Sequence, residues 1–141
     1  MRPFNYHKPT GSVNVLLVDE DPYVANVLRQ ALGNDFKLKV ITNGIEAMHW
    51  LEQGNYPDLI ITELEIPHLD GHELIQLVRG SNLMAHLPII VLSTQDDSSI
   101  RIECLESGAD AYLTKPFNPF EVRAKARAIL RRAQASMIMA S

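Results

Sequence analysis

The stretch Pro57–Gly71, PDLIITELEIPHLDG, decides the fold, because it has the pattern of a buried strand followed by an acidic loop. Its apolar run at 58–62 is typical of a strand that is covered on both faces of a parallel sheet. Glu63 follows this run directly, and Glu65 and Asp70 lie in the loop. A strand that delivers carboxylates to its C-terminal end is a common way to build a polar site. The stretch therefore raises the question of which chemistry Glu63 serves.

Four other runs share the apolar, β-branched character of this strand: VNVLLV at 13–18, LKVIT at 38–42, PIIVLS at 88–93 and AYLT at 111–114. Apolar residues at helical spacing fill the intervals and predict helices over 22–32, 44–53, 71–79 and about 97–107, with a last one from about 118. Strands that alternate with helices imply right-handed βαβ crossovers and a parallel sheet covered on both faces. Ligands bind such sheets at the carboxyl ends of the strands.

Composition sets further bounds on the protein. A chain of 141 residues suits one domain, and 46% hydrophobic with 21% charged residues is typical of a globular protein rather than a disordered one. A net charge of −4 gives no whole-chain case for nucleic-acid binding, and the single cysteine, Cys104, fits a reducing compartment. No signal peptide or membrane span is visible, which predicts a soluble, cytoplasmic protein. We expect a flexible leader at 1–12, a domain at 13–134 and a tail at 135–141.

Polar side chains follow four of the predicted strands. They are acids, hydroxyls and one amine: Asp19, Glu20 and Asp21 after the first strand, Glu63 after the third, Ser93 and Thr94 at the fourth, and Lys115 at the fifth. Carboxylates packed together repel one another, and Lys115 or a hard divalent cation such as Mg²⁺ could compensate them. Taken alone, VDED also fits a solvated turn in which Asp21 caps a helix, and Lys115 alone fits a surface lysine. The joint arrangement favours a site.

Four motifs in this order resemble the receiver domain of two-component response regulators. They are VLLVDEDP, PDLIITELEIPHLDG, PIIVLST and GADAYLTKPF, and the resemblance extends from Val13 to about Arg132. It implies an α/β, flavodoxin-like (βα)5 fold, a doubly wound parallel sheet with strand order 2-1-3-4-5. It also implies a signalling role rather than an enzymatic one, with a histidine kinase or a downstream effector as protein partner.

The resemblance assigns a role to each matching residue. These roles are Mg²⁺ ligands at Asp19, Glu20 and Glu63, the phosphoacceptor position at Glu63, the switch hydroxyl at Ser93, the rotating aromatic at Tyr112, the site lysine at Lys115 and a cis-proline at Pro116. The chain departs from the family pattern at the phosphoacceptor, because the family carries aspartate where this chain has Glu63.

Glutamate changes what this site is expected to do. Its extra C–C bond misplaces the nucleophilic oxygen, and a ~1 Å misplacement can cost ~100-fold in rate. The same extra length moves a negative carboxylate toward Ser93 and Lys115, where a phosphoryl group would sit. We therefore expect a pseudo-receiver that signals by protein contact, and Glu63 partly imitates the activated state. The alternatives are a phosphorylatable receiver, a Mg²⁺-dependent hydrolase, or the receiver half of a longer DNA-binding regulator.

Other features are assigned structural or contact roles. His68 and His72 invite a zinc interpretation, but the helix that begins at Gly71 keeps them off a shared face. Cys104 is expected in the core. The last helix is basic, and we favour a protein contact there, such as a homodimer through the face formed by the fourth helix, fifth strand and fifth helix. No helix-turn-helix fits after Arg132, so no direct nucleic-acid contact is expected within this chain.

Overall fold

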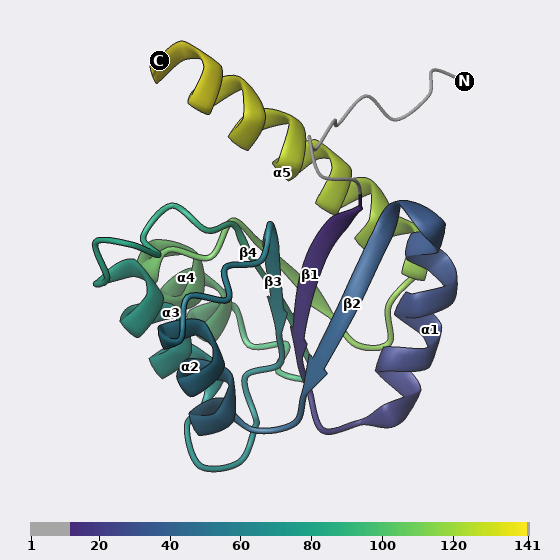
Figure 1. Cartoon of the computed structure of the whole chain (residues 1–141). Helices are drawn as coiled ribbons and strands as arrows, with labels where there is room; N and C mark the ends of the chain where they lie inside the picture. The colour runs from purple at the N-terminus through teal and green to yellow at the C-terminus, as the bar shows by residue number, and fades with distance from the viewer. Residues whose placement is uncertain (1–11, 141) are drawn as a thin grey trace.

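The computed structural model describes residues 12–140, and the side chains of residues 12–135. Its centre is a five-stranded parallel sheet of order β2-β1-β3-β4-β5, which confirms the predicted flavodoxin-like α/β fold (Figure 1). The strands are β1 (Val13–Val18), β2 (Phe36–Ile41), β3 (Leu59–Thr62), β4 (Ile89–Ser93) and β5 (Ala111–Thr114). The α-helices are α1 (Pro22–Leu32), α2 (Gly44–Glu52), α3 (Gly71–Arg79), α4 (Ser98–Ser107) and α5 (Pro119–Ala140), and a 3₁₀ turn covers Gly33–Asp35.

The observed boundaries agree closely with the predicted runs, with two differences. β2 begins at Phe36, ahead of the predicted start, because its first residues pair with the first residues of β1. Helix α5 continues through residue 135, where a tail was predicted, as far as Ala140. The leader predicted at 1–12 lies outside the described residues except for Ser12.

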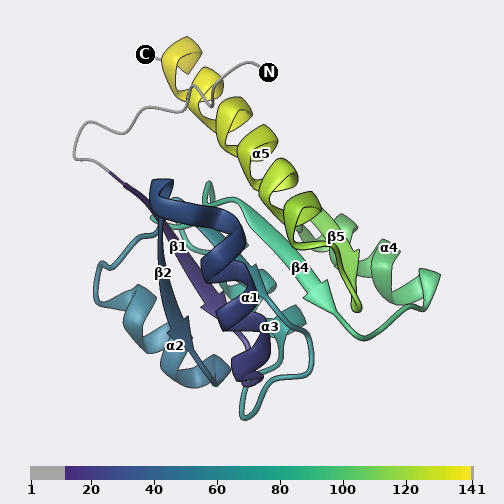
Figure 2. The ribbon, with the colours of Figure 1, turned by 90° about the vertical axis from the view of Figure 1, so that its right-hand side faces the viewer.

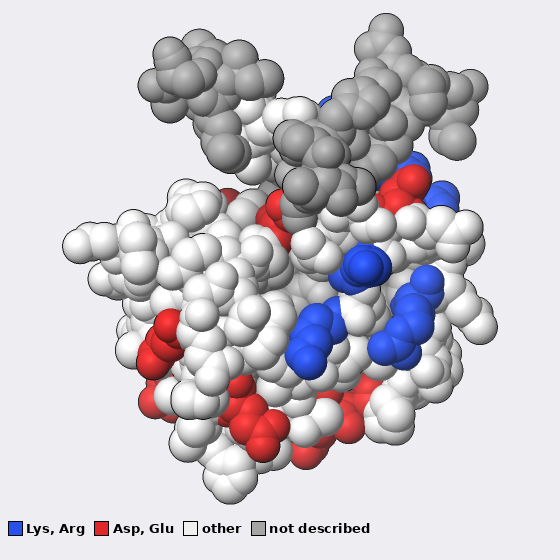
Figure 3. Space-filling view, viewed as in Figure 1, with Lys and Arg blue, Asp and Glu red and all other residues white. Residues whose placement is uncertain are grey.

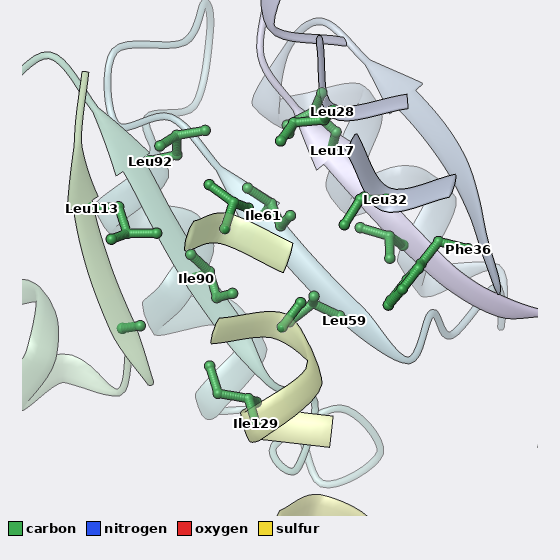
Figure 4. Close-up of a cluster of buried hydrophobic side chains, with 14 of the residues drawn as sticks. Leu17, Leu28, Leu32, Phe36, Leu59, Ile61, Ile90, Leu92, Leu113 and Ile129 are labelled. Carbon is green, nitrogen blue, oxygen red and sulfur yellow. The ribbon is translucent and has the colours of Figure 1, made fainter. Parts of the chain in front are cut away.

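Two hydrophobic layers cover the two faces of the sheet. Helices α1 and α5 lie on one face, and α2, α3 and α4 lie on the other (Figures 1 and 2). Along each strand the side chains alternate between the layers, as the pleat requires. Leu17 and Ile61 enter the layer of α1 and α5, which Figure 4 shows, whereas Leu16 and Ile60 enter the other. All four side chains are fully buried, so the sheet core is dry on both faces.

Two helices place their apolar face differently from the prediction. For α5 the sequence predicted an apolar face of Phe120, Ala124, Ile129 and Leu130. Ile129 and Leu130 are buried as predicted, whereas Phe120 and Ala124 are exposed and Val122 and Ala126 are buried in their place. For α3 the sequence predicted Leu74, Leu77 and Val78. Leu74 and Val78 are buried as predicted, whereas Leu77 is exposed and Ile75 is also buried. The predicted sets mixed residues from two faces of each helix, and packing on the sheet selects one. No helix within residues 12–140 is both long and apolar enough to cross a membrane.

Four helices begin with an Asp or Asn cap just beyond the carboxyl edge of the sheet. Asp21, Asn43, Asp70 and Asp97 each accept a hydrogen bond from a backbone N–H in the first turn of α1, α2, α3 and α4. Such caps typically contribute ~1 kcal/mol each. Their carboxylates and amide are therefore committed to local structure, and this removes Asp21 and Asp70 from the acids available to a site.

Candidate functional site

The carboxyl ends of β1, β3, β4 and β5 bring four polar side chains together. Glu63 N–H donates to the carbonyl of Val18 (3.0 Å), which places Glu63 beside Asp19. Lys115 N–H donates to the carbonyl of Ser93 (2.8 Å), which continues the pairing of β4 with β5 past its last register pair. Asp19, Glu63 and Ser93 are buried, and the Lys115 side chain is 15% exposed. We call this largely buried cluster of two carboxylates, one hydroxyl and one ammonium group the acidic pocket.

Lys115 is the central cation of this pocket. Its Nζ lies 2.8 Å from Asp19 Oδ2 and 2.8 Å from Glu63 Oε2, so one ammonium bridges both buried carboxylates. The second Asp19 oxygen, Oδ1, accepts a hydrogen bond from Asp21 N–H at 2.9 Å. The predicted need for charge compensation is therefore met by the lysine within the protein itself.

The two oxygens of the Glu63 carboxylate each have a close donor. Its Oε1 accepts from Leu64 N–H (2.7 Å) and, at a longer 3.4 Å, from Glu65 N–H, while its Oε2 takes Lys115. The Ser93 hydroxyl acts on the same carboxylate and helps to lower its pKa. Backbone N–H groups, a hydroxyl and an ammonium are the donors that bind tetrahedral oxyanions in proteins. Glu63 thus fills an anion-binding pocket with its own side chain.

These contacts shift the pKa values of the two central groups in opposite directions. Burial by itself would raise the pKa of Glu63, but hydrogen bonds from Lys115, Ser93 and Leu64 N–H outweigh it, and the pKa lies below the ordinary 4.5. Burial by itself would lower the pKa of Lys115, but the carboxylates of Asp19 and Glu63 hold it above 10.5. Both directions favour the charged pair at neutral pH.

A close backbone approach fixes the loop behind Glu63. Gly71 N–H donates to the carbonyl of Leu64 (2.9 Å), and a Cβ at Gly71 would lie only 2.3 Å from the Glu63 carbonyl oxygen. Only glycine fits there, because the nearest neighbours are main-chain atoms of Glu63 and Leu64 that cannot move aside. Helix α3 is thereby packed directly against the residue at the phosphoacceptor position.

A second set of contacts links the pocket to the surface at β5. Tyr112 O–H donates to the carbonyl of Gln95 (2.6 Å), and Gln95 N–H donates to Ser93 Oγ (3.1 Å). Tyr112 is half-buried, and the guanidinium of Arg101 on α4 lies 5.8 Å from its ring centroid. Ser93 therefore contacts Glu63 on one side and the Gln95–Tyr112 pair on the other. The Lys115–Pro116 peptide bond is cis.

The residues as arranged do not fit a resident Mg²⁺ ion. Asp19 and Glu63 converge, but on the Lys115 ammonium, and Glu20 is exposed on the turn. Among the described side chains no three His, Cys, Asp or Glu residues form a group that could hold a metal. The assignment of Asp19, Glu20 and Glu63 as Mg²⁺ ligands stays a prediction, and in this structure the Lys115 ammonium lies between the Asp19 and Glu63 carboxylates. His72 instead contacts the hydroxyl of Ser107 at 3.0 Å.

Sequence reasoning missed two contributors to the site. Leu64 N–H and Glu65 N–H bind Glu63 through the backbone, and no residue letter reports such a donor. Gln95 was also missed, although its position shortly after Ser93 was a signal. Its backbone contacts both Ser93 and Tyr112, and its side-chain amide contacts the Glu65 carboxylate across the mouth of the pocket.

Comparison with known proteins identifies the relatives of this arrangement. A family model described as the response regulator receiver domain matches residues 15–127. The chain is 38% identical over 122 residues to the response regulator MprA of Mycobacterium tuberculosis (strain ATCC 25177 / H37Ra), a match that covers 86% of this chain and 52% of MprA. The chain thus spans about half the length of that relative.

Solved structures agree with this match. The receiver domain of the Francisella response regulator 1452 superposes with a TM-score of 0.78 at 32% identity, over 86% of this chain and 98% of that domain. The Mn²⁺-bound form of response regulator Rcp1 superposes with a TM-score of 0.72 at 25% identity, over 83% and 91% of the two chains. The metal in the latter structure is a property of Rcp1.

Proposed function

The chain belongs to the response regulator receiver domain family, and from this premise we propose that it is a pseudo-receiver. In this role it acts in a two-component or phosphorelay pathway and signals by protein–protein contact, without accepting a phosphoryl group at Glu63. The observation that carries the proposal is the Glu63 carboxylate, which binds the Lys115 ammonium at 2.8 Å and has its pKa lowered by that ammonium and by the Ser93 hydroxyl. Those donors are the ones that the family resemblance assigns to an incoming phosphoryl group.

Geometry and charge both oppose phosphoryl transfer here. Phosphoryl transfer depends on positioning and on charge neutralisation at the transferred group. Lys115 is already held between two carboxylates, so it is not available without breaking a buried ion pair. The added methylene of Glu63 also displaces the nucleophilic oxygen from the position of an aspartate oxygen, and a displacement of ~1 Å can cost ~100-fold in rate.

The same contacts favour a constitutively active-like arrangement. Glu63 carries a charge of about −1 against about −1.5 to −2 for a phosphate, so it is a partial mimic. It holds Ser93, and the Tyr112 hydroxyl is fixed on the Gln95 carbonyl. The neighbouring α4 buries just Cys104 and exposes Ile102 and Leu105. This leaves an apolar surface near the switch for a protein partner, which is a downstream effector, a histidine kinase or a second copy of the chain.

Phosphodonor treatment tests the proposal. The protein is incubated with acetyl phosphate and Mg²⁺ and its intact mass is measured, with Glu63→Asp as the matched variant. We expect no added phosphoryl mass on the native chain, and we expect partial labelling of Glu63→Asp, because the aspartate would free the space beside Lys115 and Ser93. Robust labelling of native Glu63 would overturn the proposal in favour of a phosphorylatable receiver.

We also propose that this chain can serve as the receiver module of a longer response regulator. The supporting observation is the coverage, since the chain matches about half the length of MprA. In that case any DNA contact would come from another domain. An antibody raised against the chain would detect a product clearly larger than 15.8 kDa in cells, and a product of that size would refute this second proposal.

A further inference from the structure

A basic and aromatic surface lies along β2, the edge strand farthest from the switch strand β5. We name it the β2 edge surface and define it by Arg29, Lys37, Lys39, Trp50 and Tyr56. In Figure 3 basic side chains gather over β2 and its neighbourhood, while acidic side chains lie along the lower margin, at the left and near the top. The chain as a whole carries a net charge of −4, so the positive charge of this surface is opposite in sign to the net charge.

Two hollows flank this strand. The first, of about 490 Å³, is lined by Lys37, Lys39, Trp50 and Tyr56 together with two asparagines, Asn14 and Asn55. The second, of about 450 Å³, brings Arg29 of α1 to the other side of Lys37. The two hollows meet at Lys37 and Leu38 on the edge strand, and the first sets amide groups and aromatic rings beside the cations. Such hollows can bind a segment of chain rather than a flat surface.

The cations of this surface are not consumed by internal ion pairs. Among the described side chains neither Arg29 nor Lys37 forms a salt bridge, and Lys39 makes a cation–π contact with Trp50 at 5.9 Å. The acid that precedes the strand, Asp35, instead faces Arg127 of α5 at 3.8 Å. The three cations are therefore exposed and form no salt bridge within the described part of the protein.

The backbone of β2 offers a second kind of complementarity. Within the described chain β2 pairs with β1 on one side, and no strand pairs with its outer side. Lys37 and Lys39 are two residues apart and point to the same face, ~6.6 Å from each other along the strand. An added strand with acids at alternate positions would place one carboxylate near each lysine while its backbone pairs with the edge.

We propose that the β2 edge surface binds an extended acidic segment of a partner protein by strand addition. Carboxylates at alternate positions would contact Lys37 and Lys39, and the segment would cover Trp50 and Tyr56. The overall negative charge and the small number of cations argue against a nucleic acid, whose binding needs many phosphate contacts. Because β2 and β5 lie at opposite edges, this docking does not depend on the Ser93–Tyr112 switch or on the proposed lack of phosphorylation.

Lysines on an exposed edge strand can also serve to prevent pairing between two copies of the protein, and this role requires no ligand. The test separates the two roles with a labelled peptide in which glutamate alternates with valine or threonine. Binding is followed by the fluorescence of Trp50, the one tryptophan of the chain, and by amide NMR shifts. The double reversal Lys37→Glu/Lys39→Glu is compared with Lys125→Glu, a matched reversal of an exposed lysine on α5. A peptide with N-methylated backbone amides tests the strand pairing.

We expect saturable binding with amide shifts that centre on β2. The double reversal should weaken this binding by about tenfold or more, whereas Lys125→Glu should change it less than about twofold. The N-methylated peptide should bind weakly. Three results would overturn the proposal: no saturation up to about 1 mM peptide, an equal loss for Lys125→Glu, or tighter binding of a single-stranded oligonucleotide of equal charge. The first result would indicate that the lysines only prevent edge-to-edge pairing of the protein.

Discussion

Replacing Lys115 with methionine tests the central claim that a protein-borne cation holds the acidic pocket together. Methionine keeps an unbranched apolar chain and removes the ammonium. Asp19 and Glu63, whose side chains are 3% and 6% exposed, would then face each other without a partner. We expect a large loss of folding stability at neutral pH, because two buried carboxylates that lose their counter-charge repel one another and cannot be solvated.

The size of the loss follows from the burial of the three groups. At an effective dielectric constant of about 20, each 2.8 Å contact corresponds to roughly 6 kcal/mol of attraction before the cost of desolvation is subtracted. Removing one partner of a buried pair typically costs about 3–5 kcal/mol. Since domains of this kind have a free energy of unfolding of about 5–15 kcal/mol, Lys115→Met should remain folded but with a clearly lower urea midpoint.

The assay is urea unfolding at pH 7, followed by Trp50 fluorescence, on four proteins that form a double-mutant cycle. These are the native chain, Lys115→Met, Glu63→Gln and the double variant. Glu63→Gln matches the carboxylate in shape and removes its charge. We expect the double variant to lose less than the sum of the single losses, with a coupling energy of about 1–3 kcal/mol. The slope m should stay constant across the set, because the folded surface does not change.

A loss below about 1 kcal/mol for Lys115→Met at pH 7 would refute the reasoning, because it would show that the carboxylates do not depend on this cation. Strict additivity in the cycle would refute the direct Lys115–Glu63 contact. The folded state of each variant is checked by far-UV circular dichroism, so that a failure to fold is not read as a loss of coupling.

Three further predictions concern pH, packing and thiol chemistry. The pKa of Glu63 lies below 4.5 in the folded protein, so its contribution to stability is present above pH 4.5 and is lost as the pH falls through the folded value. The free energy of unfolding should therefore fall less steeply with acidification in Glu63→Gln than in the native chain. Equal acid profiles would contradict this. Arg79→Ala should lower the free energy of unfolding, measured in urea, by about 2–4 kcal/mol. The reason is that Arg79 donates hydrogen bonds to the carbonyls of Gly108, Ala85 and Leu87. A loss below ~1 kcal/mol would contradict a stabilising role for these bonds. Cys104 is 1% exposed, and burial raises the pKa of its thiol. Ellman's reagent at pH 8 should therefore modify Cys104 in urea but not in the native protein. Rapid labelling of the native protein would contradict a core position.

The sequence by itself determined the fold class and the positions of the site residues in the chain. Short continuous apolar runs that alternate with segments of helical spacing predict a doubly wound parallel sheet. The strand order followed from the resemblance to receiver domains. Caps were also readable, as Asp21 before Pro22 shows, because capping depends on adjacent residues. The buried faces of the helices were predicted less accurately, as the exposed Phe120 and Leu77 show. When apolar residues lie on two sides of a helix, the sequence does not say which side packs on the sheet.

Tertiary structure alone decided what the acidic pocket does with its charges. The letters Asp19, Glu63 and Lys115 are equally compatible with a metal held by carboxylates and with an ammonium held by them. The outcome depends on distances of 2.8 Å between groups on three different strands, and on backbone N–H groups that no side chain announces. Local patterns fix local conformation, whereas the partner of a buried charge is set by which strand ends meet at the edge of the folded sheet.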